Sequence, residues 1–500
     1  MVNAIGELKE RIERNKQRLD CEEYSAPNLF ACGGAWPGDW PGRTLLALCE
    51  HYEASNRKDR KVFRQLSEIV DALPEYTNAH GYFGELFDGV TVNEQQVSGN
   101  SWFIRGLCDY YRITGDKATF NRLNSIGENF LVKLKPFYEK YPLVARGIGG
   151  VDGHITERKS IDGWLLSSDV GCAFIMTDGI TDLYDVTRSA RVAETIKVMI
   201  DKFLSVDCVA HEFQTHATLS ATRGILRMYK ITGEEAYLSA AKKIFALYVE
   251  HGRTVNYANF NWFGRPLTWT EPCAFIDSII LASELYFATE NYEYLAFANR
   301  AYHNAIATAQ RSNGGAGCET CLSEQNDVLC VHQYEARGCC TMRLANGLNY
   351  IRAHAVIEST DGYVALFSVG GEYESDECKF VYGFDLNAKC VRVNVLRGKV
   401  DLLLYLPVGV TVIGAAMKGG FAKLSGLNCG LYEYKIEVQL QEENYNGLQV
   451  YFYADRLCTE KQYNFPVSIC FDINGRKLSP IDGCIGVEEK LGIDAFVQKI

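Results

Sequence analysis

The residues of this sequence that could do chemistry are concentrated among its 18 cysteines. The segment Thr270-Glu271-Pro272-Cys273 is followed further along the chain by the adjacent pair Cys339-Cys340. One carboxylate and three thiolates satisfy the four-coordinate preference of Zn²⁺ for sulfur, nitrogen and oxygen ligands. Glu271, Cys273, Cys339 and Cys340 are therefore a candidate zinc site. The alternative is that Cys273 is a core residue at a helix start and that the vicinal pair is incidental.

A second thiol motif, Cys318-Glu319-Thr320-Cys321, competes for the same vicinal pair. A C-x-x-C followed by a second cysteine pair resembles a structural zinc ribbon. The glycine-rich run 314–317 before it predicts a mobile loop, although a loop can still reach a metal. The sequence leaves open whether Cys318 and Cys321 join the zinc site.

The composition of the chain narrows the class of protein and the kinds of partner that we expect. The chain carries 62 acidic and 51 basic residues, a net charge of −11, which disfavours a nucleic acid or an anionic membrane as a partner. No apolar run approaches 18 residues, so we expect no transmembrane helix. The first 19 residues are charged where a signal peptide would be apolar, which predicts a cytoplasmic protein whose thiols are mostly reduced. A homo-oligomer is possible.

Aromatic residues beside polar ones form clusters at positions typical of loops. Sugar rings offer apolar faces and a rim of hydroxyls, so their sites combine Trp or Tyr platforms with Asp, Asn and His. Together these clusters predict a cleft for a small glycoside or an oligosaccharide. The alternative for each Trp is a structural role, packed between helices. The expected substrate contacts are Trp36, Asp39, His80, Asn100, Trp102, Trp164, His216 and Trp262.

His216 also ends the segment His211-Glu212-Phe213-Gln214-Thr215-His216. A zinc metalloprotease helix requires histidines four residues apart, and here they are five apart, so that motif is excluded. His216 is left as a ligand of a sugar hydroxyl or as a structural histidine.

The first 357 residues are predicted to be helical and contain a loose repeat. A helix ends on a Tyr, a short polar turn follows, and a new amphipathic helix begins, with Thr or Ser in the turn as the expected N-cap. Repeated helical hairpins of uneven length with long aromatic loops favour an (α/α)6 barrel over a solenoid. The tyrosines are Tyr52, Tyr111, Tyr184, Tyr229 and Tyr286.

From about residue 358 the hydrophobic period changes to two, as in segments 390–395 and 400–406. We therefore expect residues 358–500 to form an antiparallel β-sandwich, making the chain mainly α with a β domain. All six tryptophans lie before residue 270, which places the expected ligand site in the helical domain, residues 1–357.

The order of these segments resembles glycoside hydrolase family 127, whose founding activity is β-L-arabinofuranosidase. The resemblance covers most of the chain from about Asn28 onward. The segments that carry it are Trp36 to Tyr52, His80-Gly81-Tyr82-Phe83-Gly84, Thr215-His216-Ala217-Thr218, Glu271-Pro272-Cys273, Asn299 to Asn304, and Cys339-Cys340-Thr341-Met342-Arg343.

The resemblance implies a zinc ion held by Glu271, Cys273, Cys339 and Cys340, with Cys339 as the nucleophile. Zinc keeps a thiol deprotonated at neutral pH, so a thiolate is available to attack the anomeric carbon. Water would then release the thioglycosyl intermediate with retention of configuration.

The sequence departs from the family at three polar positions on the sugar side. The family's general acid/base is a Glu about 16 residues before the Glu of the zinc motif, and residues 253–270 contain no Asp or Glu. A family sugar-contacting Glu appears here as Asn299, and a family His appears as Asn100. Glu319 and Glu335 are candidates for the missing acid/base because they lie near the cysteines in sequence.

The sequence thus favours a zinc-dependent retaining glycoside hydrolase. Two alternatives stay open. One is a zinc-stabilised carbohydrate-binding or catalytically degenerate protein, which the missing acid favours. The other is a different (α/α)-barrel sugar enzyme, an epimerase or a lyase.

Overall fold

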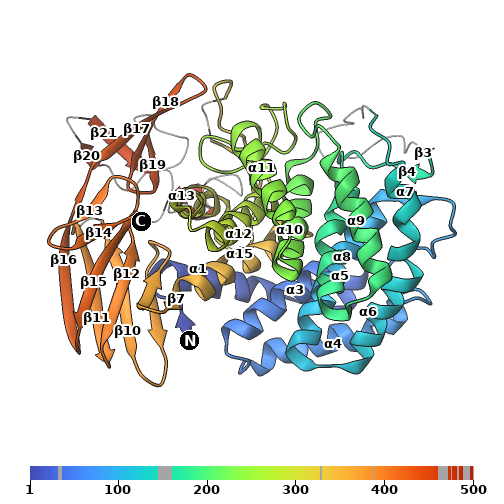
Figure 1. The fold of residues 1–500 in the computed structure, drawn as a ribbon, viewed down its shortest axis with the longest axis horizontal. Coiled ribbons are helices and arrows are strands. Elements are labelled where there is room, and N and C mark those ends of the chain that lie inside the picture. The colour runs from blue at the N-terminus through green and yellow to red at the C-terminus, as the bar shows by residue number, and fades with distance from the viewer. Residues whose placement is uncertain are drawn as a thin grey trace.

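The structure is a computed structural model. It describes residues 1–31, 36–144, 160–326, 329–386 and 388–459, together with the strand segments 471–473, 476–480, 484–487 and 496–498. Helices occupy the first part of the chain, and strands follow from residue 356 (Figure 1).

Six inner helices form a closed ring in which each packs against the next and the last packs against the first. They are α3 (Asp39–Ala54), α5 (Glu94–Thr114), α8 (Met176–Thr187), α10 (Thr215–Thr232), α12 (Pro272–Thr289) and α15 (Cys340–His354). Each inner helix packs against one outer helix. The outer helices, in the same order, are α4 (Arg60–Tyr76), α6 (Lys117–Asn129), α9 (Ala190–Leu204), α11 (Glu235–His251), α13 (Tyr292–Ala301) and α1 (Gly6–Leu19). This is an (α/α)6 barrel.

The repeated tyrosines mark the last turns of the inner helices, as expected from the sequence. Tyr111 lies in the last turn of α5 and Tyr229 in that of α10, and each helix ends on a Gly in the left-handed conformation. The expectation that Thr caps the next helix is wrong. Thr114 instead donates to the Tyr110 carbonyl and accepts from the Asp116 amide, and it is the Asp116 carboxylate that caps α6. The carboxylate has two acceptor oxygens for the free amides of the first turn.

Glycine lets the inner helices approach one another closely. A Cβ on Gly42 of α3 would lie 2.2 Å from the backbone nitrogen of Phe103 of α5. A Cβ on Gly224 of α10 would lie 2.4 Å from the Thr177 carbonyl oxygen of α8. Both distances are shorter than any van der Waals contact, so only glycine fits, and the barrel interior is correspondingly tight.

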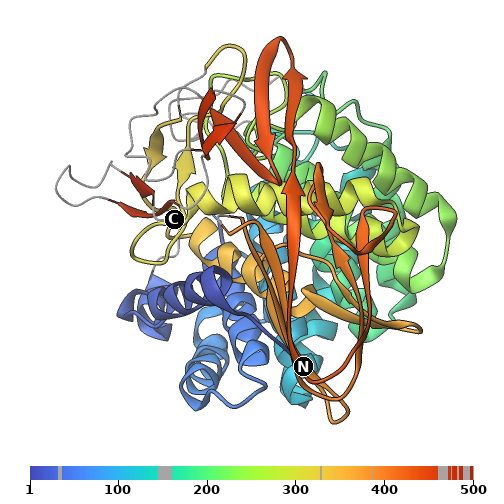
Figure 2. The same ribbon diagram turned by 90° about the vertical axis from the view of Figure 1, so that its left-hand side faces the viewer.

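Two sheets face each other beside the barrel and share one hydrophobic core (Figure 2). The six-stranded sheet has the order β1 (Val2–Asn3), β9 (Gly371–Glu374), β10 (Lys379–Asp385), β11 (Cys390–Arg397), β16 (Gly430–Val438) and β13 (Val410–Val412). The five-stranded sheet has the order β14 (Ala416–Lys418), β15 (Phe421–Leu427), β12 (Val400–Tyr405), β8 (Gly362–Ala365) and β7 (Val356–Ser359).

The β region is more elaborate than the expected sandwich. The pair β8 and β12 is parallel, and β1 is supplied by the first residues of the chain. A further five-stranded sheet has the order β17 (Leu440–Tyr445), β18 (Leu448–Tyr453), β19 (Arg456–Thr459), β21 (Arg476–Pro480) and β20 (Phe471–Ile473). The hairpin β22 (Cys484–Val487) with β23 (Phe496–Gln498) follows. Helix α15 ends at His354 and β7 begins at Val356, whereas the expected domain boundary falls between residues 357 and 358.

Short elements connect the barrel hairpins on the side where the inner helices begin. They are η1 (Glu22–Tyr24), α2 (Ala26–Ala31), β2 (Val92–Asn93), η2 (Leu131–Leu134), α7 (Lys135–Glu139), β3 (Ser160–Ile161), β4 (Trp164–Leu165), η3 (Cys172–Ile175), β5 (Cys318–Glu319) and β6 (Val331–Gln333). The segments η4 (Tyr302–Ile306) and α14 (Ala307–Ala309) continue α13 without a break. The glycine-rich run before β5, expected to be mobile, packs against α1. A Cβ on Gly314 would lie 2.1 Å from the Arg14 carbonyl oxygen.

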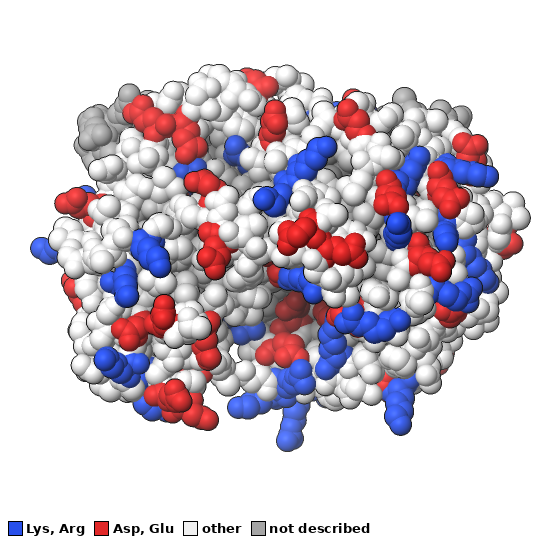
Figure 3. All heavy atoms as spheres, viewed as in Figure 1, with Lys and Arg blue, Asp and Glu red and all other residues white. Residues whose placement is uncertain are grey.

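Helix α12 is the one described helix that is long and apolar enough to cross a membrane, and 72% of it is buried inside the protein. That burial is typical of the core helix of a globular domain. Acidic and basic side chains are interspersed on the face seen in Figure 3.

Candidate metal and active site

The amino ends of two neighbouring inner helices carry the candidate zinc ligands. Glu271 is the N-cap of α12 and Cys273 lies in its first turn, after Pro272, a residue favoured at the first helical position. Cys339 is the N-cap of α15 and Cys340 its first residue. Helix amino ends carry partial positive charge and free amides, so both helices favour anions at this point.

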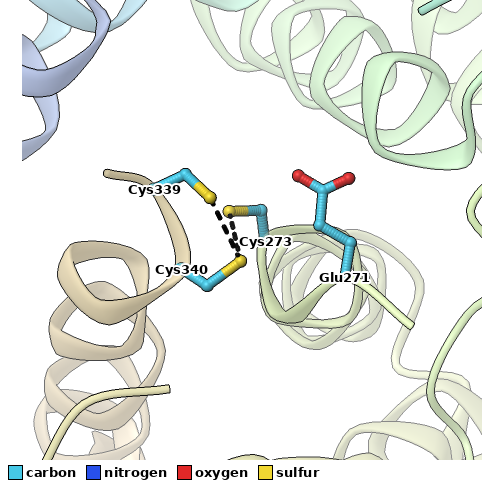
Figure 4. A group of neighbouring side chains, drawn as sticks. All are labelled: Glu271, Cys273, Cys339 and Cys340. Atoms are coloured by element: carbon cyan, nitrogen blue, oxygen red, sulfur yellow. Dashed lines mark hydrogen bonds between the residues drawn. The ribbon is translucent and has the colours of Figure 1, made fainter. Parts of the chain in front are cut away.

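The structure brings these four residues together. Their ligand atoms, one carboxylate oxygen and three sulfurs, all lie within 4.8 Å of one another. The Cys340 Sγ lies 3.5 Å from the Cys273 Sγ and 3.4 Å from the Cys339 Sγ. Figure 4 shows the four side chains projecting from the starts of α12 and α15 toward a common space.

This donor set fits a zinc ion. Four ligands at ~2.3 Å from a tetrahedral centre are about 3.8 Å apart, close to the sulfur–sulfur distances found here. Only Cys339 among the three cysteines is part-exposed, whereas Cys273 and Cys340 are buried. The arrangement therefore offers a closed set of ligands.

Without a bound cation, the pKa of each of the three cysteines lies above the usual range of a thiol. Burial holds the pKa of Cys273 and Cys340 well above the usual range of a thiol. A hydrogen bond with Cys273 acts to lower the pKa of Cys339, but the hydrogen bond with Cys340 and burial outweigh it, so that pKa is also raised. Three adjacent thiolates therefore require a cation beside them.

The Glu271 carboxylate is oriented from α10. His216 Nδ1 lies 3.1 Å from one carboxylate oxygen, and the Gln214 amide donates to the other at 3.3 Å. Burial acts to raise the pKa of Glu271, but His216 and Arg43 outweigh it and hold that pKa below its usual value. The other nitrogen of His216 faces the Asp277 carboxylate at 3.5 Å. His216 is therefore a bridge between two carboxylates.

Arg43 of α3 contacts the cluster from the opposite side. Its Nη1 donates to the Cys273 Sγ at 3.3 Å, while Nε and Nη2 donate to the two oxygens of Asp39 at 2.6 and 3.0 Å. The Asp39 carboxylate, expected to contact substrate, is thus occupied by an arginine.

Trp102 lies directly beneath the site. It is fully buried, stacks on His216, and has the guanidinium groups of three arginines over its ring. The guanidinium carbons lie 3.9, 4.6 and 4.8 Å from the ring centroid, and the residues are Arg43, Arg105 and Arg343. Such packing supplies cation–π attraction in a dry environment. Trp102 therefore supports the metal ligands from below.

The competing thiol motif divides between two environments. Cys318 lies within hydrogen-bonding reach of Cys340. Cys321 instead donates to the Asn259 carbonyl at 3.4 Å, and burial raises its pKa to about 12. Within the described residues, the group that could hold a metal includes neither of them. Cys318 is a neighbour of the site, and Cys321 is part of the loop that supports it.

Glu319 and Glu335, the candidates for the missing acid, both pair with arginines. Glu319 lies next to Cys318 on β5, binds Arg311 through one oxygen at 2.5 Å and is buried, which raises its pKa to about 8. Glu335 accepts from Arg18 and Thr341, at 2.8 and 2.9 Å.

The remaining tryptophans differ in exposure. Trp164 is buried between Tyr138 and Tyr141, and its indole nitrogen donates to the Phe137 carbonyl. Trp262 is also buried and packs edge-to-face on Trp269. Trp36 is half-buried against the cluster that contains Trp102. Of these, Trp36 offers the surface that a sugar ring could reach.

Two of the three polar side chains expected to contact sugar are hydrogen-bonded to backbone groups. Asn100 is buried and bonds both the amide and the carbonyl of Phe83. Asn299 is buried and joins α13 to the β region through the Leu366 carbonyl and the Ser368 amide. His80 is part-exposed, and its carbonyl accepts from Ser125. Contact of these three with substrate stays a prediction.

Three features of the site were not expected from the sequence. Arg43 had a detectable signal, because Asp39 and Arg43 are four residues apart on a helix, the spacing of an ion pair. The others are aromatic: Trp40 lies against Gly338, just before Cys339, and Trp269 stacks on His332 with ring centroids 4.8 Å apart. No local signal links residues so far apart in sequence.

No protein-family model matches the chain, and no curated protein matches it. Its structure is similar to several solved structures. A glycoside hydrolase matches with a TM-score of 0.62 at 14% identity, covering 91% of this chain and 81% of that one. A family 127 β-L-arabinofuranosidase from Geobacillus stearothermophilus T6 matches with a TM-score of 0.62 at 14% identity, over 92% and 86%.

A second family 127 β-arabinofuranosidase matches with a TM-score of 0.63 at 12% identity, over 91% of this chain and 84% of that one. At such identities the likeness concerns the fold, and it spans both the helical barrel and the β region. The resemblance expected from the sequence is therefore confirmed at this level: the chain has the fold of the family 127 glycoside hydrolases.

Proposed function

We propose that this protein is a retaining glycoside hydrolase in which Cys339 is the nucleophile of a metal–thiolate site. The observation that carries the proposal is the convergence of Glu271, Cys273, Cys339 and Cys340 within 4.8 Å at two helix amino ends. The fold that surrounds the site is shared with β-L-arabinofuranosidases, which supports a small glycoside as the substrate class and pentofuranosides as the first to test.

Glu271, Cys273, Cys339 and Cys340 are the residues that would hold Zn²⁺. Bound zinc would keep the thiols ionised at neutral pH, which burial alone opposes. The residues around the set hold its geometry: His216 and Gln214 orient Glu271, and Arg43 binds Cys273. Cys339 is the one part-exposed cysteine of the set and so the one that we expect a substrate to meet.

In the proposed first step, the Cys339 sulfur attacks the anomeric carbon as the glycosidic C–O bond breaks. The leaving oxygen carries away the bonding electron pair and takes a proton, and a C–S bond remains. Water then attacks the same carbon and loses a proton to the solvent, the C–S bond breaks, and the sulfur recovers its electron pair. Two displacements retain the anomeric configuration.

The source of the leaving-group proton is the open part of this mechanism. Protonation by a positioned acid is worth roughly 10²- to 10⁴-fold. Both candidate glutamates pair with arginines, and residues 253–270 contain no carboxylate. We therefore expect aryl glycosides, whose leaving groups need little protonation, to be cleaved faster than alkyl glycosides.

The same observation favours a second candidate function, a zinc-stabilised carbohydrate-binding or catalytically degenerate protein. The metal ligands are intact, whereas Asn100 and Asn299 stand where the family has ionisable groups and are bonded to backbone. In this alternative, the thiolate set stabilises the junction of α12 and α15 and no bond is cleaved.

The deciding experiment measures zinc by mass spectrometry and hydrolysis across a panel of aryl glycosides that includes pentofuranosides. One zinc per chain with turnover, abolished in Cys339→Ser, supports the hydrolase. One zinc per chain, sugar binding by calorimetry and no turnover across the panel supports the binding protein. A chain that binds no zinc contradicts both.

A further inference from the structure

Arg43 makes a contact that no other described arginine makes. Its Nη1 donates a hydrogen bond to the Cys273 sulfur at 3.3 Å, while Nε and Nη2 face the Asp39 carboxylate. The side chain is buried, and its guanidinium lies 3.9 Å above the Trp102 ring. Each of its three nitrogens therefore has a hydrogen-bond partner, and none is free to move toward another.

The arrangement is directional. Asp39 and Arg43 lie one turn apart on α3, so the two-pronged ion pair fixes the plane of the guanidinium. Trp102 covers one face of that plane. The only edge left is the one that bears Nη1, and it meets Cys273 on α12. Helix α3 thus reaches across the barrel end to a ligand on a different helix.

The three sulfurs are consequently not equivalent. Cys273 accepts a charge-assisted hydrogen bond, which is strongest when the sulfur is a thiolate. Cys340 is buried among Cys273, Cys318 and Cys339. The hydrogen-bonding partners found for Cys339 are the other two sulfurs of the set, and it is part-exposed.

We infer that Arg43 is a positioning residue of the metal site, which fixes Cys273 as a ligand and withdraws electron density from its sulfur. Cys273 is then the least nucleophilic thiolate, and attack is left to Cys339. Asp39 acts through Arg43 as its clamp, not as a sugar contact. This inference rests on the proposed metal site, but not on glycoside hydrolysis.

The test is metal affinity in the full-length protein. Partners that orient a metal ligand contribute 10- to 100-fold to affinity. We expect Arg43→Lys, which keeps the charge but loses the fork, to raise the zinc dissociation constant by that factor in competition with a chelating dye. The Co²⁺-loaded variant should also show a shifted sulfur-to-metal charge-transfer band. Asp39→Asn should change both readouts in the same direction, by less.

Arg105→Lys is the matched control. Arg105 also packs on Trp102, at 4.6 Å, and is buried, but its partner is Asp178 and not a sulfur. It should leave the dissociation constant within about twofold and the band in place. Circular dichroism and a melting curve establish that each variant is folded, and Asp39→Asn carries the test if Arg43→Lys does not fold.

Unchanged affinity and an unchanged cobalt band in folded Arg43→Lys overturn the inference. Equal weakening in Arg43→Lys and Arg105→Lys also overturns it, because the effect is then general charge and not the sulfur contact. A wild-type chain that binds zinc but hydrolyses nothing contradicts the proposed hydrolase and leaves the role of Arg43 intact. A wild-type chain that binds neither metal overturns both.

Discussion

Two layers of the barrel interior treat charge in opposite ways. At the mouth, where α12 and α15 begin, the carboxylate of Glu271 lies beside three cysteines. The guanidinium of Arg43 donates to one of them, Cys273, and is also paired with Asp39. About one helical turn deeper, two buried aspartates are surrounded by arginines. Asp178 pairs with Arg105 and Arg227 at 3.0 and 2.6 Å. Asp277 pairs with Arg343 and, at 2.7 Å, with Arg223.

The charges of the two layers are complementary. In the deeper layer, four arginines (Arg105, Arg223, Arg227 and Arg343) face Asp178 and Asp277, and Asp182 lies 3.8 Å from Arg227, which leaves an excess of one positive charge. At the mouth, one carboxylate and three thiolates carry four negative charges, and a divalent cation would leave two. His216, between Glu271 and Asp277, joins the layers. The aspartates of the deeper layer are already paired with arginines, whereas the group at the mouth could hold a cation.

The largest expected effect is at the mouth, in Cys339→Ser. Because an alcohol is not held ionised as a thiolate is, the variant should lose on the order of 10³-fold or more of kcat/KM. The variant should stay folded, with a melting temperature lowered at most as far as a chelator lowers that of the wild type. Cys429→Ser, at an exposed cysteine in the β region, is the control and should keep full activity. Equal activity in Cys339→Ser would remove the nucleophile assignment.

In the deeper layer, Asp178→Asn should lower stability without touching the thiols. It leaves buried arginines without their counter-ion, and breaking a buried ion pair typically costs about 3–5 kcal/mol. Urea unfolding measures the loss. A loss below about 1 kcal/mol would show that Asp178 does not balance these arginines, and the contrast between the layers would fail.

Removal of metal is expected to affect the mouth and so distinguishes it from the deeper layer. Cys273→Ser should lower the zinc content first and hydrolysis second, because Cys273 is a buried residue of the proposed ligand set and Cys339 is the proposed nucleophile. Excess chelator should lower the melting temperature of the wild type and have little further effect on Cys273→Ser. Equal chelator sensitivity in both proteins would place the metal elsewhere.

The smallest effect concerns pH, at Glu50 in the last turn of α3. Burial first, and then the charge of Asp109, raise the pKa of Glu50 to about 7. A folded-state pKa above the unfolded value gives stability that is present below about pH 4.5 and lost as the pH rises through 7. Glu50→Gln should therefore flatten the fall in unfolding free energy between pH 5 and 8, by about 1–2 kcal/mol because Glu50 is part-exposed. Parallel wild-type and variant curves would contradict this.

The repeat of tyrosines predicted the ring of inner helices because helix ends have local sequence signals. The convergence of the four candidate metal ligands was predicted because their residue types and their order resemble a known motif, although residues 271 and 339 are far apart in sequence. The surroundings of the tryptophans were harder to predict, because a Trp in a loop packs wherever the fold leaves space. Trp164, for example, packs against Tyr138. Likewise, nothing in the sequence near Asn100 indicates that its amide is bonded to Phe83.

The first strand of the chain has a consequence for how the protein is made. Val2 pairs with Tyr373, and α1 is the outer partner of α15, so both the sheet and the barrel are completed by segments from distant parts of the chain. At ~5–20 residues per second, a ribosome needs roughly 20 to 75 s to produce the partner of β1 after β1 itself. During that interval β1 lacks its strand partner and α1 can contact only the hairpin of α3 and α4, so the helices between can form a ring only with a gap. We therefore expect closure of the barrel to be a late event, reached after the first five inner helices have been synthesised.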